Sequence, residues 1–133
     1  MSKVRELLQE ARELLKRAEK ELTEAIQKND TLEMRDAAEK AWNAIVQATN
    51  ALILHYTGKV PTSHYERRKL LRELEKKNTT IEQLGLLDRY MARFRILHGE
   101  TFYEGIIDIE QLEIEMKKVH KYIQDIEELL KTV

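Results

Sequence analysis

The 133-residue chain has no cysteine, one proline and four glycines. The lack of cysteine excludes a disulfide framework, thiolate zinc sites, iron–sulfur clusters and a cysteine nucleophile. So little proline and glycine argues against folds with many tight turns, such as β-sandwiches, β-barrels and collagen-like chains. We therefore expect a fold with long elements and few turns.

Long apolar runs are also missing. None approaches the ~20 residues that a membrane span needs. Residues 1–20 carry charge throughout, unlike a secretory signal. We therefore expect a cytoplasmic protein without a membrane partner, a location that the absence of cysteine also suits. The 35% of charged residues is typical of thermophilic proteins as well.

Opposite charges nearly cancel, and the net charge of −1 means that the chain as a whole is not a basic nucleic-acid binder. Their distribution is uneven. Residues 64–77 hold six Lys or Arg against three acids, whereas residues 104–133 hold eight acids against four Lys. The basic segment is either the solvated side of a surface helix or a local anion-binding face.

Apolar residues recur at steps of three and four along most of the chain, which predicts amphipathic helices and no strands. The expected helices cover about 3–28, 30–56, 63–77, 80–97 and 108 to the C-terminal end. Their expected N-terminal caps are Ser2, Asp30, Ser63, Thr80 and Asp108. Residues 98–107, with two glycines, are expected to interrupt the helical period.

This pattern predicts one all-α domain over residues 1–133, an antiparallel bundle of four or five helices. The count depends on whether Asn78-Thr79-Thr80 is a break or only a kink. The last helix carries one continuous apolar seam, which packs into the bundle or pairs with a second chain. Its members are Ile109, Leu112, Met116, Val119, Ile123, Ile126 and Leu130. A homodimer is expected, since twofold symmetry is the commonest form of self-association.

Common cofactor and metal motifs are absent. The chain has no phosphate-binding loop, no G-x-G-x-x-G and no H-E-x-x-H. Ferritin-like di-iron sites need Glu three residues before His. The residues at that offset from the four histidines are Leu52, Pro61, Arg95 and Lys117. No cofactor and no metal are expected.

One late motif carries chemistry. Arg93 and His98 form an R-x4-H spacing, which Gly99 and the pair Phe102-Tyr103 follow. Two earlier segments accompany it, Ala38-Glu39-Lys40-Ala41-Trp42 and Ser63-His64-Tyr65-Glu66-Arg67-Arg68. With these segments the chain resembles the HEPN superfamily (higher eukaryotes and prokaryotes nucleotide-binding), and within it the archaeal PaREP-type branch. The resemblance spans about residues 1–130.

The resemblance implies a HEPN-like bundle of four or five helices, commonly a dimer. In active members it implies metal-independent RNA cleavage at a cleft formed by the motif from two subunits. Arg93 would bind phosphate, and His98 would be the general acid/base for attack by the RNA 2′-hydroxyl. Both roles suit the side chains, because a guanidinium matches phosphate oxygens and histidine titrates near neutral pH.

Helix geometry qualifies this motif. In an unbroken α-helix, residues five apart differ by about 140° of rotation, so Arg93 and His98 would point to different sides. Arg95 would be the neighbour of His98. His64 and Arg67 lie one helical turn apart and suit an anion, and an aromatic such as Tyr103 near His98 can stack a base.

Arg95, His64, Arg67 and Tyr103 thus form the candidate nucleotide- or RNA-binding set beside the catalytic pair Arg93 and His98. The structural alternative is that His98 is an inert, hydrogen-bonded histidine at a bundle seam and that Trp42 is a core residue. The first functional hypothesis is a HEPN-like bundle that binds RNA or a nucleotide, as a metal-independent ribonuclease of toxin or defence type. The second is a non-catalytic homodimeric interaction protein, so enzymatic activity stays open.

Overall fold

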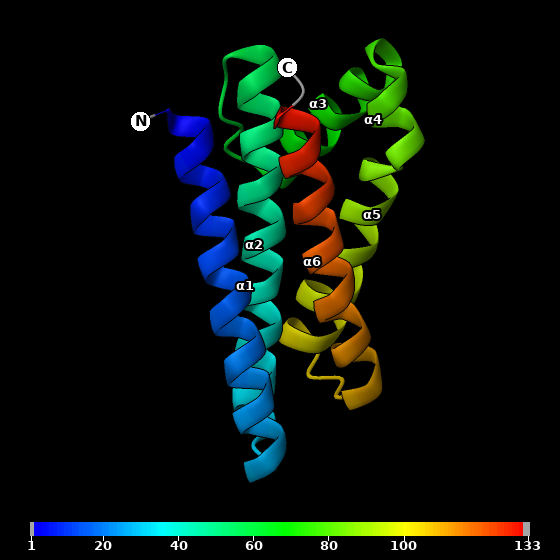
Figure 1. Cartoon of the computed structure of the whole chain (residues 1–133). Coiled ribbons are helices and arrows are strands. Elements are labelled where there is room, and N and C mark those ends of the chain that lie inside the picture. Colours follow the sequence, from blue (N-terminus) through cyan, green and yellow to red (C-terminus); the bar gives the residue numbers. More distant parts are fainter. Residues whose placement is uncertain (1, 132–133) are drawn as a thin grey trace.

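The computed structural model describes residues 2–131, and the regular elements in this range are all helical. Six α-helices and one π-helix follow one another along the chain (Figure 1). They are α1 (Lys3–Lys28), α2 (Thr31–Thr57), α3 (His64–Lys77), α4 (Thr79–Leu84), α5 (Leu86–Arg93), η1 (Phe94–Tyr103) and α6 (Ile109–Lys131). The predicted all-α class is confirmed.

Most helices begin at the predicted caps. The side chains of Ser2, Asp30 and Ser63 each accept a hydrogen bond from the backbone N–H three residues ahead. The Asp108 carboxylate accepts one from the N–H of Gln111 in the same way. These bonds satisfy N–H groups that have no partner within the helix, so short sequence signals are enough to place the helix starts.

The helix expected over residues 80–97 differs from the prediction. Asn78, not Thr80, caps α4, because its Oδ1 accepts the N–H of Ile81 at 3.1 Å. Gly85 then adopts a φ of 65° and ends α4. The interruption expected from residue 98 begins later, since η1 continues to Tyr103 as a π-helix.

Long helices of alternating direction form the bundle. Figure 1 shows α1 and α2 running in opposite directions, and α5–η1 running opposite to α6. Figure 1 also places α3 and α4 at the end of the bundle where α1 begins and α6 ends. This arrangement puts η1 at the other end, beside α2 and the start of α6.

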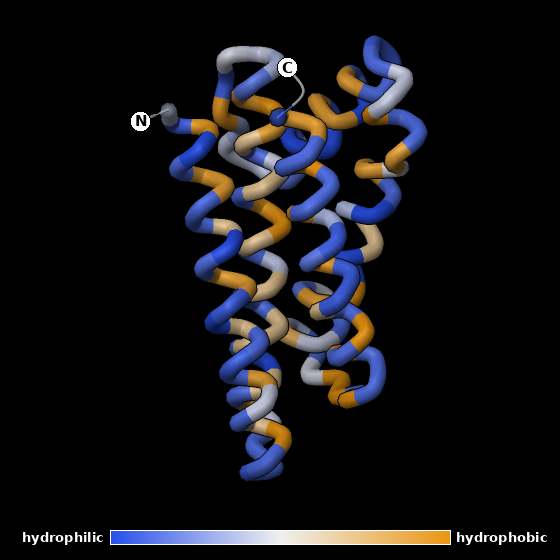
Figure 2. Tube along the Cα trace, viewed as in Figure 1, coloured by the Kyte–Doolittle hydropathy of each residue, from blue (hydrophilic) through white to orange (hydrophobic). Residues whose placement is uncertain are grey.

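Alanines let α1 and α2 pack closely. Ala11, Ala18 and Ala25 recur every seven residues on α1 and are fully buried. The facing helix α2 buries its own row of small side chains, Ala37, Ala38, Ala41, Ala44, Ala48 and Ala51. Small side chains at a contact shorten the distance between helix axes. Figure 2 shows the apolar residues of these helices gathered on inner faces and the polar residues outside.

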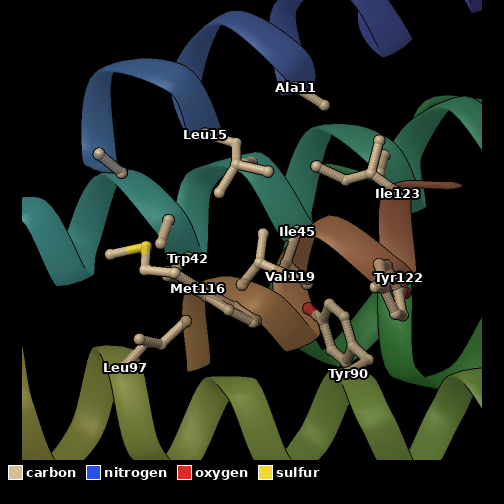
Figure 3. Packing of buried hydrophobic residues seen from close by; sticks show 14 of the residues in the cluster. Ala11, Leu15, Trp42, Ile45, Tyr90, Leu97, Met116, Val119, Tyr122 and Ile123 are labelled. Carbon is tan, nitrogen blue, oxygen red and sulfur yellow. The ribbon is translucent and has the colours of Figure 1, made fainter. Parts of the chain in front are cut away.

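Trp42 lies in the core, as the structural alternative predicted, with 5% of its surface exposed. Figure 3 shows Trp42 near Leu97 of η1 and Met116 of α6. The apolar seam of α6 faces this same core, where Leu112, Met116, Val119, Ile123 and Ile126 are buried. The chain itself therefore fills these five seam positions, and a second copy cannot pair through them without opening the bundle. Ile109 is exposed and Leu130 is partly exposed.

Across residues 2–131, no helix combines the length and the apolar character that crossing a membrane requires.

Candidate functional site

Four partly exposed rings stack in a row where α3 meets η1. We call His64, Phe94, His98 and Phe102 the ring row. The centroid of Phe94 lies 3.9 Å from that of His64 and 5.5 Å from that of His98, at interplanar angles of 16° and 22°. The Phe102 ring continues the row 5.9 Å beyond His98, at 26°. The row places two histidines on one aromatic surface.

The π-helix explains why three of these rings align. Phe94, His98 and Phe102 are four residues apart in η1. A π-helix closes i→i+5 hydrogen bonds, so its turn is wider than an α-turn. A four-residue step then keeps side chains on one flank. Trp42 of α2 supports this flank, with centroid distances of 5.4 Å to Phe94 and 6.3 Å to His98.

Arg35 of α2 anchors the C-terminal end of η1. Its Nε and Nη2 donate to the carbonyl oxygen of Phe102 at 2.9 and 2.7 Å, and Nη2 also donates to that of Tyr103 at 3.2 Å. Carbonyl groups at a helix end have no partner within the helix, and a cation there also complements the helix dipole. The contact thus ties the last turn of the ring row to α2.

His98 is oriented by a carboxylate. Its Nδ1 lies 2.8 Å from Oε1 of Glu39 on α2, and the His98 side chain is 34% exposed. An ionised carboxylate only accepts hydrogen bonds, so Nδ1 carries the proton of this contact. Nε2 of His98 is then the nitrogen that can exchange a proton with a bound molecule.

His64 has a different hydrogen-bonding environment. Its Nδ1 lies 2.9 Å from the hydroxyl of buried Tyr90, and that hydroxyl also accepts from Nε of Arg67 at 3.0 Å. Burial lowers the pKa of His64, and the positive charges of Arg67 and Arg68 and the imidazole of His98 lower it further. Burial also raises the pKa of Tyr90, which keeps its hydroxyl protonated.

Arg93 faces away from the ring row. Its Nε and Nη2 donate to the two carboxylate oxygens of Glu115 on α6, at 2.6 and 3.2 Å. Gln111 donates to the same carboxylate at 3.0 Å. Arg93 is 5% exposed and Glu115 is fully buried. Arg93 and His98 thus have partners on different helices, Glu115 on α6 and Glu39 on α2.

Arg95 and Tyr103 lie in other surroundings. The side chain of Arg95 is 80% exposed, and its Nε donates to Glu100 at 3.2 Å. It lines a hollow of about 730 Å³ together with Phe94 of the ring row, Ile106 and Gln111. Tyr103 is 77% exposed. Of the six residues predicted for the site, the structure therefore brings together His98, His64 and Arg67.

Sequence reasoning missed Glu39 and Tyr90. Each has a signal in the sequence. Glu39 lies one helical turn before Trp42. Tyr90 lies four residues before Phe94, so it continues the four-residue spacing of the rings. Neither signal names the partner, because Glu39 and His98 are 59 residues apart in the chain.

Acidic and imidazole side chains do not gather into a metal site in the described part of the chain. Across residues 2–131, no group of three or more His, Cys, Asp or Glu has the arrangement to hold a metal ion.

Comparison with known proteins identifies a family. The sequence model described as the Archaeal PaREP1/PaREP8 family matches residues 13–123. The matched range contains the whole ring row together with Glu39, Arg67, Arg93 and Glu115. No curated protein matches the chain.

Proposed function

We propose that this chain, which belongs to the archaeal PaREP1/PaREP8 family, is a HEPN-like bundle that binds RNA or a nucleotide on the ring row and cleaves RNA without metal. The all-helical fold and the R-x4-H spacing at the junction of α5 and η1 support the HEPN-like assignment. The cleavage of RNA would serve a toxin or defence role.

The observation that carries this proposal is the contact between His98 and Glu39. A partly exposed imidazole is oriented through Nδ1 by a carboxylate 2.8 Å away, which directs its proton exchange to Nε2. A histidine oriented in this way is a frequent general acid or base, and positioned proton transfer contributes roughly 10²–10⁴-fold to a rate. The carboxylate also stabilises the positive charge that the ring gains on protonation.

The proposed step needs no metal. Nε2 of His98 takes the proton of a 2′-hydroxyl while the 2′-oxygen forms a bond to the adjacent phosphorus. The bond from phosphorus to the 5′-oxygen breaks, and that oxygen takes a proton from a water molecule. The resulting hydroxide takes the 2′-hydroxyl proton back from Nε2 of His98. The products are a 2′,3′-cyclic phosphate and a 5′-hydroxyl end. Every group used on the protein side belongs to the ring row or contacts it.

The surroundings of His98 suit a single-stranded substrate. The rings of the row cover one another's faces, so a base would stack at the Phe102 end of the row, a contact worth about 1–3 kcal/mol. Arg67 adds a positive charge beside His64 at one end of the row. A chain of net charge −1 then binds RNA through a local surface and not through its overall charge.

Cleavage of a mixed-sequence single-stranded RNA tests the proposal. Wild-type protein, His98→Ala and His55→Ala are incubated with it, with and without a chelator. His55 is an exposed histidine of α2 outside the ring row, so its variant controls for loss of any imidazole. We expect cleavage that survives the chelator, is unchanged in His55→Ala and is lost in His98→Ala. Thermal unfolding of both variants checks that they fold.

Two results contradict the proposal. Cleavage that persists in folded His98→Ala removes His98 from the mechanism, and cleavage that the chelator abolishes replaces a metal-free site with a metal-dependent one. A wild type that neither cleaves nor binds the RNA favours the alternative.

The alternative is a non-catalytic homodimeric interaction protein. Its supporting observation is a group of exposed isoleucines around the start of α6, Ile106, Ile109 and Ile114, which are 49%, 36% and 39% exposed. Ile106 and Ile109 are three residues apart in the chain, and exposed apolar side chains are common in association surfaces. Ile106 and Ile114 lie outside the apolar seam of α6 and Ile109 is its exposed first member, so association through them leaves the bundle intact.

Light scattering after gel filtration tests the alternative. A homodimer that Ile106→Ser and Ile109→Ser convert to a monomer, and that binds no RNA at physiological salt, supports it. Salt-sensitive RNA binding contradicts the non-catalytic, non-binding role, since such sensitivity reports phosphate contacts.

A further inference from the structure

The guanidinium of the R-x4-H motif is already occupied. Two of the nitrogens of Arg93 contact Glu115, the carboxylate receives a further bond from Gln111, and the side chain is 5% exposed. Binding a phosphate there requires breaking a two-point ion pair inside the protein. Removing one partner from such a buried pair leaves an uncompensated charge in the interior, which is strongly unfavourable.

A second guanidinium lies beside the ring row. Arg67 is partly exposed, and among residues 2–131 its side-chain hydrogen bond is the one from Nε to Tyr90. Nη1 and Nη2 therefore keep their donors for a bound group. The hydroxyl of Tyr90 joins Arg67 to His64, whose ring stacks on Phe94.

Hydrogen-bond counting assigns the protonation of His64. A phenol has one proton to donate and lone pairs to accept with. The proton of a buried phenol needs an acceptor. Among residues 2–131 the Tyr90 hydroxyl has hydrogen-bond contacts to Arg67 and His64, and a guanidinium cannot accept, so His64 Nδ1, at 2.9 Å, is the acceptor. His64 then carries its proton on Nε2, as a neutral ring that donates. The lowered pKa of His64 agrees with this neutral form.

We propose that Arg67 and His64 bind an RNA phosphate at their end of the ring row, with Phe94 between this subsite and His98, and that Arg67 and not Arg93 supplies the guanidinium that binds phosphate. This inference rests on the proposed function and names the phosphate subsite of the same surface. Nη1 and Nη2 of Arg67 and Nε2 of His64 present donors and no acceptor, which suits an anionic phosphodiester. A His64 that stays neutral does not compete with His98 for the transferred proton.

Binding of an RNA that cannot be cleaved tests the subsite without activity. The probe is a fluorescent mixed-sequence single strand with every 2′-hydroxyl methylated, followed by anisotropy at several salt concentrations. In Arg67→Gln we expect a Kd that is roughly 10- to 100-fold weaker, the loss of a charged hydrogen bond. The slope of log Kd against log salt should fall by about 0.7, one phosphate contact on a single strand.

Three control variants separate this subsite from its alternatives. Arg17→Gln on α1 and Arg72→Gln on α3 each remove one exposed positive charge, and we expect binding within twofold of the wild type. Arg93→Met combined with Glu115→Leu removes the buried pair without leaving an unpaired charge, and binding should again be unchanged. Thermal unfolding reports whether the double variant folds. If it does not, Arg67→Gln against Arg72→Gln decides.

Nitrogen NMR of the histidine rings gives a second readout. We expect His64 as the neutral Nε2–H form at pH 7, with signals that move when the methylated RNA is added. The signals of His55 should stay in place, because this histidine lies outside the ring row.

The outcomes distinguish this inference from the proposed function. If His98→Ala abolishes cleavage while Arg67→Gln binds and cleaves like the wild type, the subsite is wrong and the ribonuclease stands. If Arg72→Gln weakens binding as much as Arg67→Gln does, the basic side of α3 binds diffusely and the subsite is also wrong. If the wild type neither binds nor cleaves RNA, both fail together.

Discussion

Arg93 of α5 and Glu115 of α6 form an ion pair that is almost closed to solvent, with N–O distances of 2.6 and 3.2 Å. The pair lies where α5 passes into the π-helix η1, and it joins that junction to α6. In this structure the arginine of the R-x4-H motif therefore connects two helices, while the histidine of the motif faces α2.

This pair predicts a large asymmetry between single and double substitutions. Glu115→Ala leaves the Arg93 charge buried without a partner, and we expect the free energy of unfolding to fall by about 3–5 kcal/mol. Arg93→Met with Glu115→Leu should lose much less, because no charge remains in the interior. Urea denaturation measures both, and Glu113→Ala on the exposed side of α6 is the control. Equal losses in the single and double variants would show that packing and not charge determines the effect.

The environment of His64 predicts a pH dependence of stability. Its pKa lies below the ordinary value of 6.5, because of burial, Arg67 and Arg68 on α3, and His98 on η1. Tyr90 on α5 is the remaining titratable group in contact with it. Below pH 6.5 the unfolded chain takes up a proton on this histidine that the folded chain does not, so stability falls as the pH is lowered.

Comparison with His64→Gln isolates this contribution. The free energy of unfolding is measured for both proteins at pH 8, 7, 6 and 5. Taking the difference between them cancels the contribution of the carboxylates, which both proteins share. Below pH 6.5 we expect the wild type to lose more of its free energy of unfolding than His64→Gln does. A constant difference would mean that His64 titrates alike in the folded and unfolded chains.

Glu39 should act as a positioning residue for His98. Glu39→Ala removes the acceptor of the Nδ1 proton, and under the proposed function we expect cleavage to slow roughly 10²-fold. Glu39→Gln keeps an oxygen that can accept this hydrogen bond, so its cleavage rate should lie between those of the wild type and Glu39→Ala. Binding of the methylated RNA should stay unchanged, since orientation and not affinity is lost. The control is Glu13→Ala, an exposed carboxylate of α1. A matching loss of binding in Glu39→Ala would indicate a general disturbance of the surface.

Replacing Gly105 by alanine should lower the stability of the protein, and the same change at Gly58 is the control. The φ of Gly105 is 74°, and a Cβ there would lie 3.3 Å from the guanidinium of Arg35, which holds the end of η1. Gly58 has a φ of 76° with no atom within 4 Å of such a Cβ. Both alanine variants therefore carry backbone strain, worth about 1–3 kcal/mol.

We expect Gly105→Ala to lower the thermal unfolding midpoint more than Gly58→Ala, because it also displaces Arg35. Equal shifts would mean that Arg35 adjusts without weakening the cap of η1.

Local signals in the sequence predicted the helices and most of their starts. Steps of three and four between apolar residues report one face of a helix, and Asp30, Ser63 and Asp108 each cap through a bond to a residue three positions ahead. Such interactions involve residues close in the chain, so they can be inferred without knowing the fold. The same local rules placed a cap at Thr80 where Asn78 provides it, because neighbouring polar residues compete for this role.

Only the tertiary structure decided which side chains meet. The spacing drew attention to Arg93 and His98, but packing gave them Glu115 and Glu39, 22 and 59 residues away. The π-helical turns of η1 set the ring row, and Arg35 on another helix anchors their end. Sequence periodicity thus determined which faces are buried, because burial of an apolar face depends on local spacing. The partners of the polar groups depended on how whole helices cross, which no local pattern contains.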